Sequence, residues 1–413
     1  MGILDVPGLS RARGDQLYAS RDVSELIQGR FPRPDERKLL GPLAAGNDLP
    51  TVTPNAAPSG AYTRVYAVSA NTPPADWPVD SGEAPVNIQN QYIRSEPQGQ
   101  ARLQRIEMDG PRLALKTENL TPGGDAFLLW VNGAPYSLDL TLFGPTDTFT
   151  TIEFAGPAVR SIEILTTASI SAVYTSAPYR LWKPPPAVGP LALLMGDSYS
   201  AGVTIDAAAP ATTQSPRMNG FAARAGLHLG IDRWMTDGVG GTGAANDGGG
   251  WGTYLTRLQN WMDLELDAFI AGGGGSNDFY NDFATMVEVV DAYVELYGTA
   301  RDRWAGAKLG FFEGFSPPNG FATFGPKYIE LRQTLQTELA GVGVYYFDIA
   351  TSSAWIDGTG YKGATTGVGN SDIYIGGDGI HFTTEGGDYI LGRLIPKLRA
   401  MFADNGELLN TLI

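Results

Sequence analysis

Continuous runs of apolar residues alternate with amphipathic segments in the C-terminal half of the chain. Four such runs cover residues 191–195, 266–271, 309–312 and 342–347. Strands that are buried on both faces carry few polar positions, so these runs predict a parallel sheet with helices on both sides. A shorter run at residues 234–236 adds a further strand.

The segments between these runs have the spacing of amphipathic helices. One of them places its apolar residues on a single stripe of a helix. The stripe consists of Phe283, Met286, Val287, Val290, Tyr293, Val294 and Tyr297. A second helix is expected to begin near Pro326, because the first turn of a helix tolerates proline, and a third to cover residues 384–402.

Residues 62–181 have a different pattern, in which short runs of alternating apolar and polar residues follow one another. Such runs occur at residues 112–116 and 161–164, and turn-forming pairs such as Asn132-Gly133 separate them. Strands at this spacing, with few helical periods between them, predict an all-β sandwich.

Proline-rich segments mark the boundaries of these regions. Residues 1–60 are polar and interrupted by prolines, which predicts an N-terminal arm with one short helix over residues 15–27. Three consecutive prolines at positions 184–186 predict a stiff, extended linker, because each fixes φ and disfavours helix before it. We therefore expect three parts: the arm, a β-sandwich domain at residues 61–182 and an α/β domain at residues 187–413.

Charge and residue content narrow the chemistry. The chain has 413 residues, with 29 Lys and Arg against 44 Asp and Glu, and its formal charge of −15 disfavours nucleic acid and anionic membranes as partners. It has no Cys and two His, which excludes thiol nucleophiles, disulfides and metal sites built on Cys or three His. No apolar stretch has the length of a signal peptide or a transmembrane helix, so we expect a soluble protein without membrane insertion; its localisation stays open.

Polar residues that can carry chemistry follow two of the predicted strands, where the carboxyl ends of a parallel sheet place ligand sites. Ser198 follows the first strand in Gly-Asp-Ser, a sequence that fits a nucleophile and also an ordinary turn. Asn277 comes after four glycines, which let the backbone approach a ligand, and it fits an oxyanion donor or a helix cap. Residues 237–243 form a glycine-rich loop that suits an anion but is no dinucleotide fingerprint, so no nicotinamide cofactor is expected.

One of the two histidines has a carboxylate at a useful distance. Asp378 precedes His381 by three residues, close enough in one turn to accept the Nδ1 proton and to direct Nε2 toward a nucleophile. By itself, Asp-x-x-His is a common sequence. The other histidine, His228, shares a helical face with Phe221 and Ala225, and we interpret it as structural.

Together, Gly-Asp-Ser, Gly-x-Gly-Gly, Gly-x-Asn-Asp and Asp-x-x-His stand in the order found in the SGNH hydrolase superfamily, also called GDSL, which the chain resembles over residues 190–403. The resemblance implies an α/β, flavodoxin-like hydrolase domain with a parallel sheet. It makes Ser198 the nucleophile, His381 the general base and acid, and Asp378 the residue that orients His381. It assigns the oxyanion hole to the Ser198 and Gly241 backbone N–H groups and the Asn277 side chain.

Two positions depart from the pattern of this superfamily. Thr236-Asp237 stand where many members carry Asn, and Phe382 follows the catalytic histidine where Pro is frequent. The first departure leaves Gly240 as an alternative to Gly241 in the oxyanion hole. The second does not affect the triad.

A jelly-roll-like β-sandwich joined by a proline-rich segment to a hydrolase domain, with the N-terminal arm before it, also resembles the two-domain carbohydrate acetylesterases of this superfamily. Tyr199, Trp251, Phe279 and Tyr280 suit stacking on sugar rings, although core packing is the alternative for each. We therefore expect a serine esterase that removes short acyl groups, in particular acetyl, from an acylated carbohydrate or surface glycan. No metal and no organic cofactor is expected.

Two other functions fit the same sequence. A general lipase or thioesterase would use the same residues on a different ester. A bacteriophage tail or fibre protein that carries an esterase domain would account for the polar N-terminal region and the lack of a signal peptide and of Cys. In that case the N-terminal region would serve in homo-oligomer formation or virion assembly.

Overall fold

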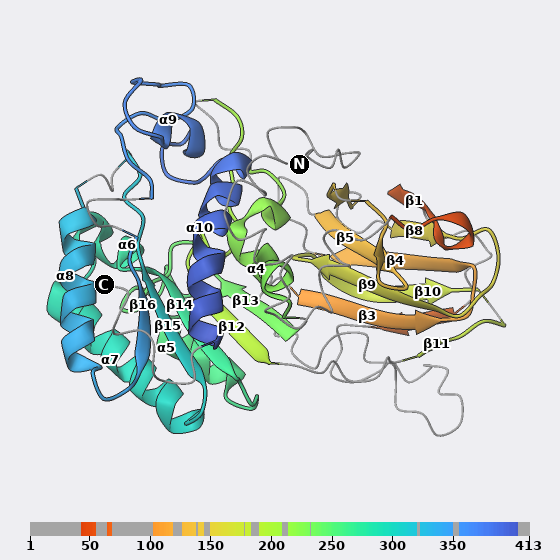
Figure 1. The fold of residues 1–413 in the computed structure, drawn as a ribbon, viewed down its shortest axis with the longest axis horizontal. Coiled ribbons are helices and arrows are strands. Elements are labelled where there is room, and N and C mark those ends of the chain that lie inside the picture. The colour runs from red at the N-terminus through yellow and green to blue at the C-terminus, as the bar shows by residue number, and fades with distance from the viewer. Residues whose placement is uncertain are drawn as a thin grey trace. The chain divides into compact units, whose positions relative to one another are not determined.

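The computed structural model describes residues 43–54, 64–67, 102–118, 126–137, 139–143, 149–176, 178–182, 190–208, 214–231, 233–319, 323–349 and 355–403. They fall into two compact units, a β-rich unit up to residue 182 and an α/β unit from residue 190 onward (Figure 1). The arm helix expected at residues 15–27, the N-terminal region expected to serve in assembly and the linker at 184–186 lie outside the described residues.

The β-rich unit is a sandwich of two antiparallel sheets. Its strands are β1 (Thr51–Pro54), β2 (Arg64–Ala67), β3 (Arg102–Met108), β4 (Arg112–Glu118), β5 (Ala126–Val131), β6 (Ala134–Pro135), β7 (Thr141–Leu142), β8 (Phe149–Glu153), β9 (Arg160–Thr166), β10 (Ser169–Thr175) and β11 (Leu181–Trp182). One sheet has the order β1-β8-β4-β10-β2 and the other β11-β3-β9-β5-β6, with β7 paired to β5.

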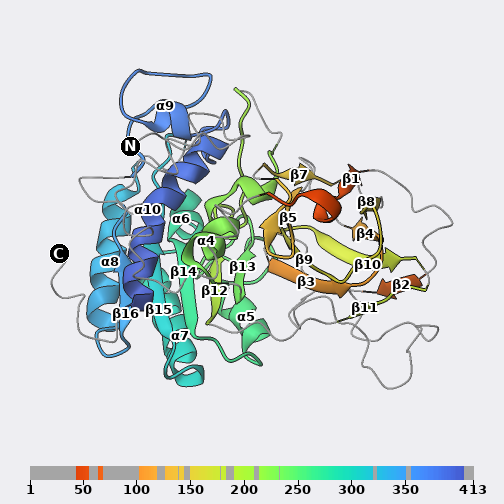
Figure 2. The ribbon, with the colours of Figure 1, turned by 45° about the vertical axis from the view of Figure 1, so that its right-hand side comes forward.

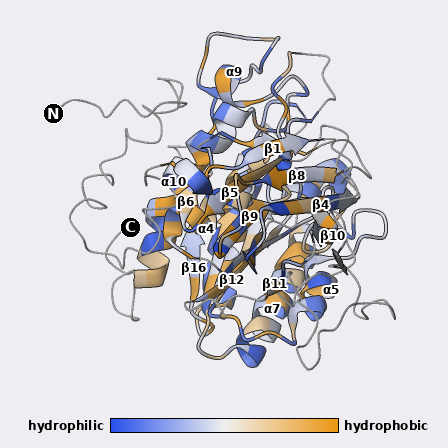
Figure 3. Ribbon diagram, turned by 90° about the vertical axis from the view of Figure 1, so that its right-hand side faces the viewer, coloured by the Kyte–Doolittle hydropathy of each residue, from blue (hydrophilic) through white to orange (hydrophobic). Residues whose placement is uncertain are grey.

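Both sheets contribute to one hydrophobic core. Leu113 and Ile152 come from the first sheet, and Ile106 and Ile162 from the second. Figure 3 shows hydrophobic and hydrophilic positions following one another along these strands, as a sheet with one buried face requires. The predicted β-sandwich is confirmed.

The described part of the expected arm belongs to this sandwich. β1 pairs with β8 at the edge of its sheet, and Ala44 is buried in the core, where its backbone N–H donates to the carbonyl oxygen of Pro135. Pro50 precedes β1 and Pro54 ends it, and an edge strand tolerates proline because one of its sides needs no ladder hydrogen bonds. The assignment of residues 44–54 to an arm was therefore wrong.

The α/β unit contains one parallel sheet. Its strands are β12 (Leu191–Gly196), β13 (Arg233–Gly238), β14 (Ala268–Gly274), β15 (Lys308–Glu313) and β16 (Val344–Phe347). Their order is β13-β12-β14-β15-β16, and Figure 2 shows them side by side. This is the flavodoxin-like order, in which the chain leaves β12 in one direction and later returns to its other side. The predicted fold class is confirmed.

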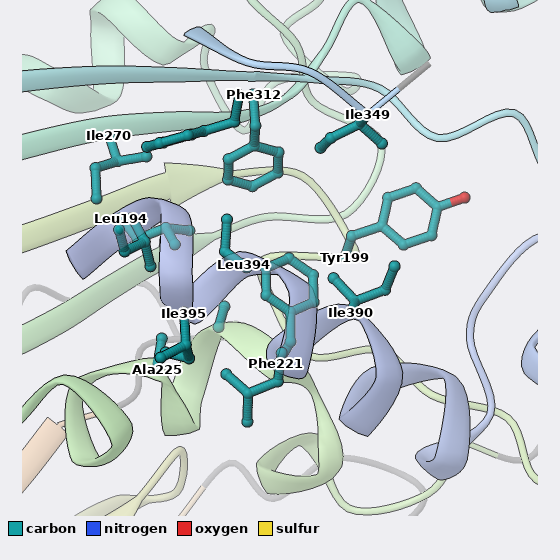
Figure 4. Packing of buried hydrophobic residues seen from close by; sticks show 14 of the residues in the cluster. Leu194, Tyr199, Phe221, Ala225, Ile270, Phe312, Ile349, Ile390, Leu394 and Ile395 are labelled. Carbon is teal, nitrogen blue, oxygen red and sulfur yellow. The ribbon is translucent and has the colours of Figure 1, made fainter. Parts of the chain in front are cut away.

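Helices cover both faces of this sheet. The helices of this unit are α4 (Phe221–Leu229), α5 (Tyr254–Leu258), α6 (Ser276–Phe279), α7 (Met286–Arg303), α8 (Gly325–Glu338), α9 (Ser371–Tyr374) and α10 (Thr384–Ala403), with short 3₁₀ turns at Arg217–Asn219, Gln259–Trp261 and Tyr280–Asp282. The β-rich unit has a 3₁₀ turn at Gly46–Asp48. On one face, Phe221 of α4 and Leu394 of α10 pack with Leu194 and Phe312 of the strands (Figure 4). On the other face, the Tyr293 ring of α7 meets the Phe311 ring of β15 edge-on, with 5.1 Å between ring centroids.

The buried face of α7 differs from the predicted stripe. A capping box begins the helix at Met286: the Thr285 side chain accepts from the Glu288 backbone N–H, and the Glu288 carboxylate accepts from the Thr285 backbone N–H. Phe283 therefore lies outside the helix, and Phe283 and Val287 are 56% and 68% exposed. The residues that α7 buries are Val289, Val290, Tyr293, Leu296, Tyr297 and Ala300.

The glycine run after the third predicted strand is part of that strand. β14 continues through Gly274, although the sequence favoured a loop that brings backbone close to a ligand. A Cβ on Gly272 would overlap the Phe312 ring, and one on Gly274 would lie 2.5 Å from the Phe311 ring. These glycines therefore make room for neighbouring aromatic rings of β15, and the earlier interpretation was wrong for them.

Two glycine substitutions should have opposite effects on stability. A Cβ on Gly238, at the end of β13, would overlap the backbone of Ala201, so Gly238→Ala should destabilise the fold by several kcal/mol or prevent folding. Gly298 lies within α7 with no atom near its Cβ position, so Gly298→Ala should stabilise by about 0.5 to 1 kcal/mol. Urea denaturation measures both, and equal stability of Gly238→Ala and the wild type would contradict this account.

Candidate active site

The structure brings Ser198, His381 and Asp378 together at the carboxyl ends of the parallel strands. His381 Nε2 lies 3.0 Å from Ser198 Oγ, and His381 Nδ1 lies 2.6 Å from Asp378 Oδ2. An ionised Asp378 accepts the Nδ1 proton, which leaves Nε2 with a lone pair directed at the serine hydroxyl. The arrangement can therefore remove a proton from Ser198.

The turn that carries the aspartate and the histidine is held by backbone hydrogen bonds. Asp378 Oδ1 accepts from the backbone N–H groups of Ile380 and His381, each at 3.0 Å. Burial alone would raise the pKa of Asp378, but these bonds and the contact with the His381 ring outweigh it, and the pKa is lowered. Asn319, in the segment after β15, donates from Nδ2 to the Asp378 carbonyl oxygen at 2.9 Å.

Ser198 lies on a tight turn directly after β12. The backbone N–H of Ala201 donates to the Asp197 carbonyl oxygen at 2.8 Å, and that of Val203 donates to the Ser198 carbonyl oxygen at 3.0 Å. The Asp197 carboxylate accepts from the Tyr199 backbone N–H at 2.9 Å. Among the described residues nothing accepts from the Ser198 backbone N–H, which stays available to a substrate.

The residues assigned to the oxyanion hole carry N–H hydrogens that no acceptor among the described residues uses. Asn277 Nδ2 donates one hydrogen to the Thr242 carbonyl oxygen at 3.0 Å, which fixes the amide and leaves its second hydrogen available. Within the described chain, the backbone N–H groups of Gly240 and Gly241 have no acceptor. A Cβ on Gly240 would lie 3.7 Å from the Ser198 Cβ, so this loop passes next to the serine. The choice between the two glycines stays open.

Asp278 joins the helix of Asn277 to the loop that follows the glycine pair. Its carboxylate accepts from the backbone N–H groups of Ala244, Ala245 and Asn246, at 2.8 to 3.1 Å. Burial nevertheless raises the pKa of Asp278. A Cβ on Gly243 would overlap this carboxylate, which explains the glycine there. Asp278 thereby fixes the spacing between the Asn277 side chain and the glycine loop.

No protein-family model and no curated protein matches the chain. Solved structures do match. The family two carbohydrate esterase of Clostridium thermocellum, solved in complex with cellohexaose, is 16% identical with a TM-score of 0.52, covering 75% of this chain and 96% of that one. A family 2 carbohydrate esterase with a carbohydrate binding domain from Corynascus thermopiles (Myceliophthora fergusii) is 13% identical with a TM-score of 0.51, covering 76% and 98%. A putative GDSL-like lipase from Bacteroides ovatus is 13% identical with a TM-score of 0.51, covering 86% and 98%.

The chain has an SGNH hydrolase-like fold. The resemblance inferred from four short motifs is thus confirmed at the level of fold. In this SGNH-like fold, Ser198 and Asn277 follow β12 and β14, the neighbouring strands between which the strand order reverses. That reversal is where open α/β sheets bind ligands.

Two of the aromatic residues expected to contact substrate are part of the core. Tyr199 is 3% exposed and belongs to the hydrophobic cluster of Figure 4. Its hydroxyl donates to the Ile380 carbonyl oxygen at 3.0 Å, and its ring packs on Phe382, with 4.8 Å between centroids. Phe279 is 1% exposed and packs near Tyr328. Both expectations were wrong, because the two rings are buried and pack against other aromatic rings of the core. Trp251 and Tyr280 are 44% and 40% exposed, and contact with substrate stays a prediction for them.

His228 lies on α4 and takes part in no hydrogen bond with the triad. Burial, aided by the positive charge of Arg224, lowers the pKa of His228 to about 4, so the ring is neutral at neutral pH. Its carbonyl oxygen accepts from Arg399 of α10 at 2.9 Å. These contacts fit the structural role expected of it.

Sequence reasoning missed several residues that support the site. Asn319 and Asp278 follow strands of the sheet. The expectation that functional residues follow the carboxyl ends of the strands, which located Ser198 and Asn277, therefore applies to them as well. Arg257 of α5 carried no signal, because its partner Asp237 stands 20 positions away in the chain.

The described residues include no group of three or more His, Asp or Glu that could hold a metal ion. Among the same residues, no helix combines the length and the apolar content needed to cross a bilayer.

Asp197 should make stability depend on pH in a defined direction. Burial raises its pKa from 3.8 to about 7, although Tyr199 and Arg257 act against this shift. Between these values the unfolded chain is ionised and the folded one is not, so rising pH favours unfolding until the folded group ionises. Asp197→Asn, which does not titrate, should therefore gain stability relative to the wild type from pH 4 to 7, by on the order of 4 kcal/mol.

Urea denaturation at several pH values measures this difference in the free energy of unfolding. Asp291→Asn, on the exposed face of α7, is the matched control and should show no such trend. A constant difference between Asp197→Asn and the wild type across this range would contradict a neutral buried carboxyl group.

Proposed function

We propose that the protein is a serine esterase that removes short acyl groups, in particular acetyl, from a carbohydrate. The observation that carries the proposal is the chain of two short contacts, from Ser198 Oγ to His381 Nε2 at 3.0 Å and from His381 Nδ1 to Asp378 Oδ2 at 2.6 Å. This is the geometry that nucleophilic catalysis by serine needs.

The reaction proceeds through an acyl-enzyme. His381 Nε2 takes the Ser198 proton as Oγ bonds to the ester carbonyl carbon, and the carbonyl electron pair moves onto oxygen. Backbone N–H groups and the Asn277 amide stabilise this oxyanion. The C–O bond to the sugar then breaks, and the sugar oxygen takes the proton from His381. Water, activated by His381, hydrolyses the acyl-enzyme in the same way and releases the carboxylic acid.

A carbohydrate substrate is supported by the solved structures of similar fold and by one surface residue. Two of those structures are named as carbohydrate esterases, and one of these is solved in complex with cellohexaose. In this chain Trp251 is 44% exposed, and its backbone N–H donates to the Asp247 carbonyl oxygen in a loop whose Gly248 lies against Gly241. An exposed indole on a loop that lies against Gly241 suits stacking on a sugar ring.

The preference for acetyl rests on the resemblance to the two-domain carbohydrate acetylesterases of the SGNH superfamily. The glycine loop lies beside the nucleophile without crowding it, because a Cβ on Gly240 would lie at an ordinary contact distance of 3.7 Å from the Ser198 Cβ.

Ser198→Ala and His381→Ala should each abolish turnover of p-nitrophenyl acetate, with a loss of at least about a thousandfold in kcat. The double variant should be scarcely worse than either single one, because the two residues act as a unit. The other histidine provides the control: His228→Asn should keep kcat near the wild-type value. Retention of activity in Ser198→Ala would refute the proposed nucleophile, and longer esters turned over faster than acetate would indicate a lipase or thioesterase.

Trp251→Ala should affect sugar esters and not small esters. We expect KM for an acetylated xylo- or cello-oligosaccharide to rise about tenfold, while kcat/KM for p-nitrophenyl acetate stays within about twofold, because a stacking residue binds the sugar and not the acetyl group. Phe283→Ala, at another exposed aromatic residue (56% exposed), is the control and should change neither value. An unchanged KM in Trp251→Ala would remove Trp251 from the substrate site.

A further inference from the structure

We propose that Arg257 and Asp237 are positioning residues that hold the nucleophile turn and the glycine loop at the spacing required for the oxyanion hole. This inference rests on the proposed function, since it concerns the same site. We refer to Arg257, Asp237 and Trp261 as the Arg257–Asp237 bridge. None of the three belongs to the triad or to the donors assigned to the oxyanion.

The bridge joins the ends of two adjacent strands. Arg257 Nη2 donates to the Gly196 carbonyl oxygen at the end of β12, at 2.8 Å, and Nη1 donates to Asp237 Oδ1 of β13, at 3.1 Å. Trp261 Nε1 donates to the second oxygen of the same carboxylate at 2.7 Å. Arg257 is 3% and Asp237 4% exposed, so water competes little for these bonds.

The two strand ends lead directly into the catalytic loops. Gly196 stands two residues before Ser198, and Asp237 stands four before Gly241. The pairing of β12 with β13 ends at Gly196 opposite Gly238, and beyond that point ladder hydrogen bonds no longer set the distance between the chains. The bridge links Gly196 of this last pair to Asp237 of the pair before it, so it holds together the two strand ends that lead to the Ser198 and Gly241 N–H groups.

Close contact between the turns makes their spacing sensitive to the bridge. A Cβ on Gly238 would overlap the Ala201 backbone, which shows that the two turns pack backbone against backbone. The Val239 backbone N–H also donates to the Gly196 carbonyl oxygen, at 3.1 Å, so that oxygen is shared between the bridge and the glycine loop. A shift of the guanidinium would therefore move both loops.

Stability alone does not explain a buried ion pair at this place. Replacing such a pair by well-packed apolar residues is often neutral or stabilising, because the desolvation penalty of the two buried charges offsets much of their attraction. A guanidinium, however, is a rigid planar fork that can bind two acceptors at a fixed separation. Arg257, bound to the Gly196 carbonyl oxygen and to Asp237, is such a fork between β12 and β13.

The test compares the bridge with a second buried ion pair in the same unit. Arg224 Nη1 lies 2.6 Å from Asp388 Oδ1 and joins α4 to α10, with side chains 13% and 4% exposed. The variants are Arg257→Lys and Asp237→Asn for the bridge, and Arg224→Lys and Asp388→Asn for the control. The readouts are kcat and KM for p-nitrophenyl acetate, and the thermal midpoint of unfolding.

We expect the bridge variants to lose about tenfold to a hundredfold in kcat with KM within about twofold of wild type, because misplaced oxyanion donors weaken binding only where charge develops. The control variants should show a comparable fall in thermal midpoint and a kcat near wild type. Bridge variants with wild-type kcat, measured well below their midpoints, would overturn the inference.

A milder substitution keeps the inference testable if the bridge variants fold poorly. Trp261→Phe removes the hydrogen bond to Asp237 Oδ2 while keeping an aromatic ring at this buried position, and should lower kcat by a smaller factor, about threefold to tenfold, again without a change in KM. An unchanged kcat in this variant would contradict the bridge. Absence of Ser198-dependent turnover in the wild type would overturn the proposed function and the bridge together, whereas normal wild-type turnover with fully active bridge variants overturns the bridge alone.

Discussion

The parallel pairing of β12 with its two neighbours is the constraint on which the proposed site depends. β12 pairs with β13 from Leu191 opposite Arg233 to Gly196 opposite Gly238, and on its other side with β14. Parallel strands in register end at the same edge, so three loops far apart in the sequence emerge side by side. A slip of one residue in either pairing would turn the side chains of that strand to the opposite face and displace the residue that follows it.

Buried polar residues beneath this edge hold the loops of the proposed site in place. Asp197, Asp237 and Asp278 are all almost fully buried. Asp197 accepts from the Tyr199 backbone N–H within its own turn, whereas Asp237 and Asp278 accept from other segments, at Trp261 and Ala245. Burying a carboxyl group is costly unless hydrogen bonds compensate for the loss of water. The nucleophile turn, the glycine loop and the α6 turn are therefore fixed before any substrate binds, which is the condition for electrostatic stabilisation of an oxyanion.

Hydrophobic periodicity predicted the sheet and its class, and the resemblance of four short motifs to the SGNH hydrolase superfamily predicted that Ser198 and His381 act together. Sequence patterns failed where tertiary packing decides. Tyr199 and Phe279 were expected to contact substrate, with core packing as the alternative, and they lie in the core; no local pattern distinguishes a stacking aromatic residue from a packing one. The ion pair of Asp237 with Arg257 forms between segments 20 residues apart, so only the folded chain reveals it.

The central claim is that His381 and Asp378 activate Ser198 as a nucleophile, and covalent labelling tests it most directly. The full chain would be treated with a fluorophosphonate, which reacts with activated serines, and the adduct located by peptide mass spectrometry. The account predicts one adduct per chain, on Ser198, with labelling at least about a hundredfold slower in His381→Ala. Labelling of a different residue, or equally fast labelling of Ser198 without His381, would contradict it.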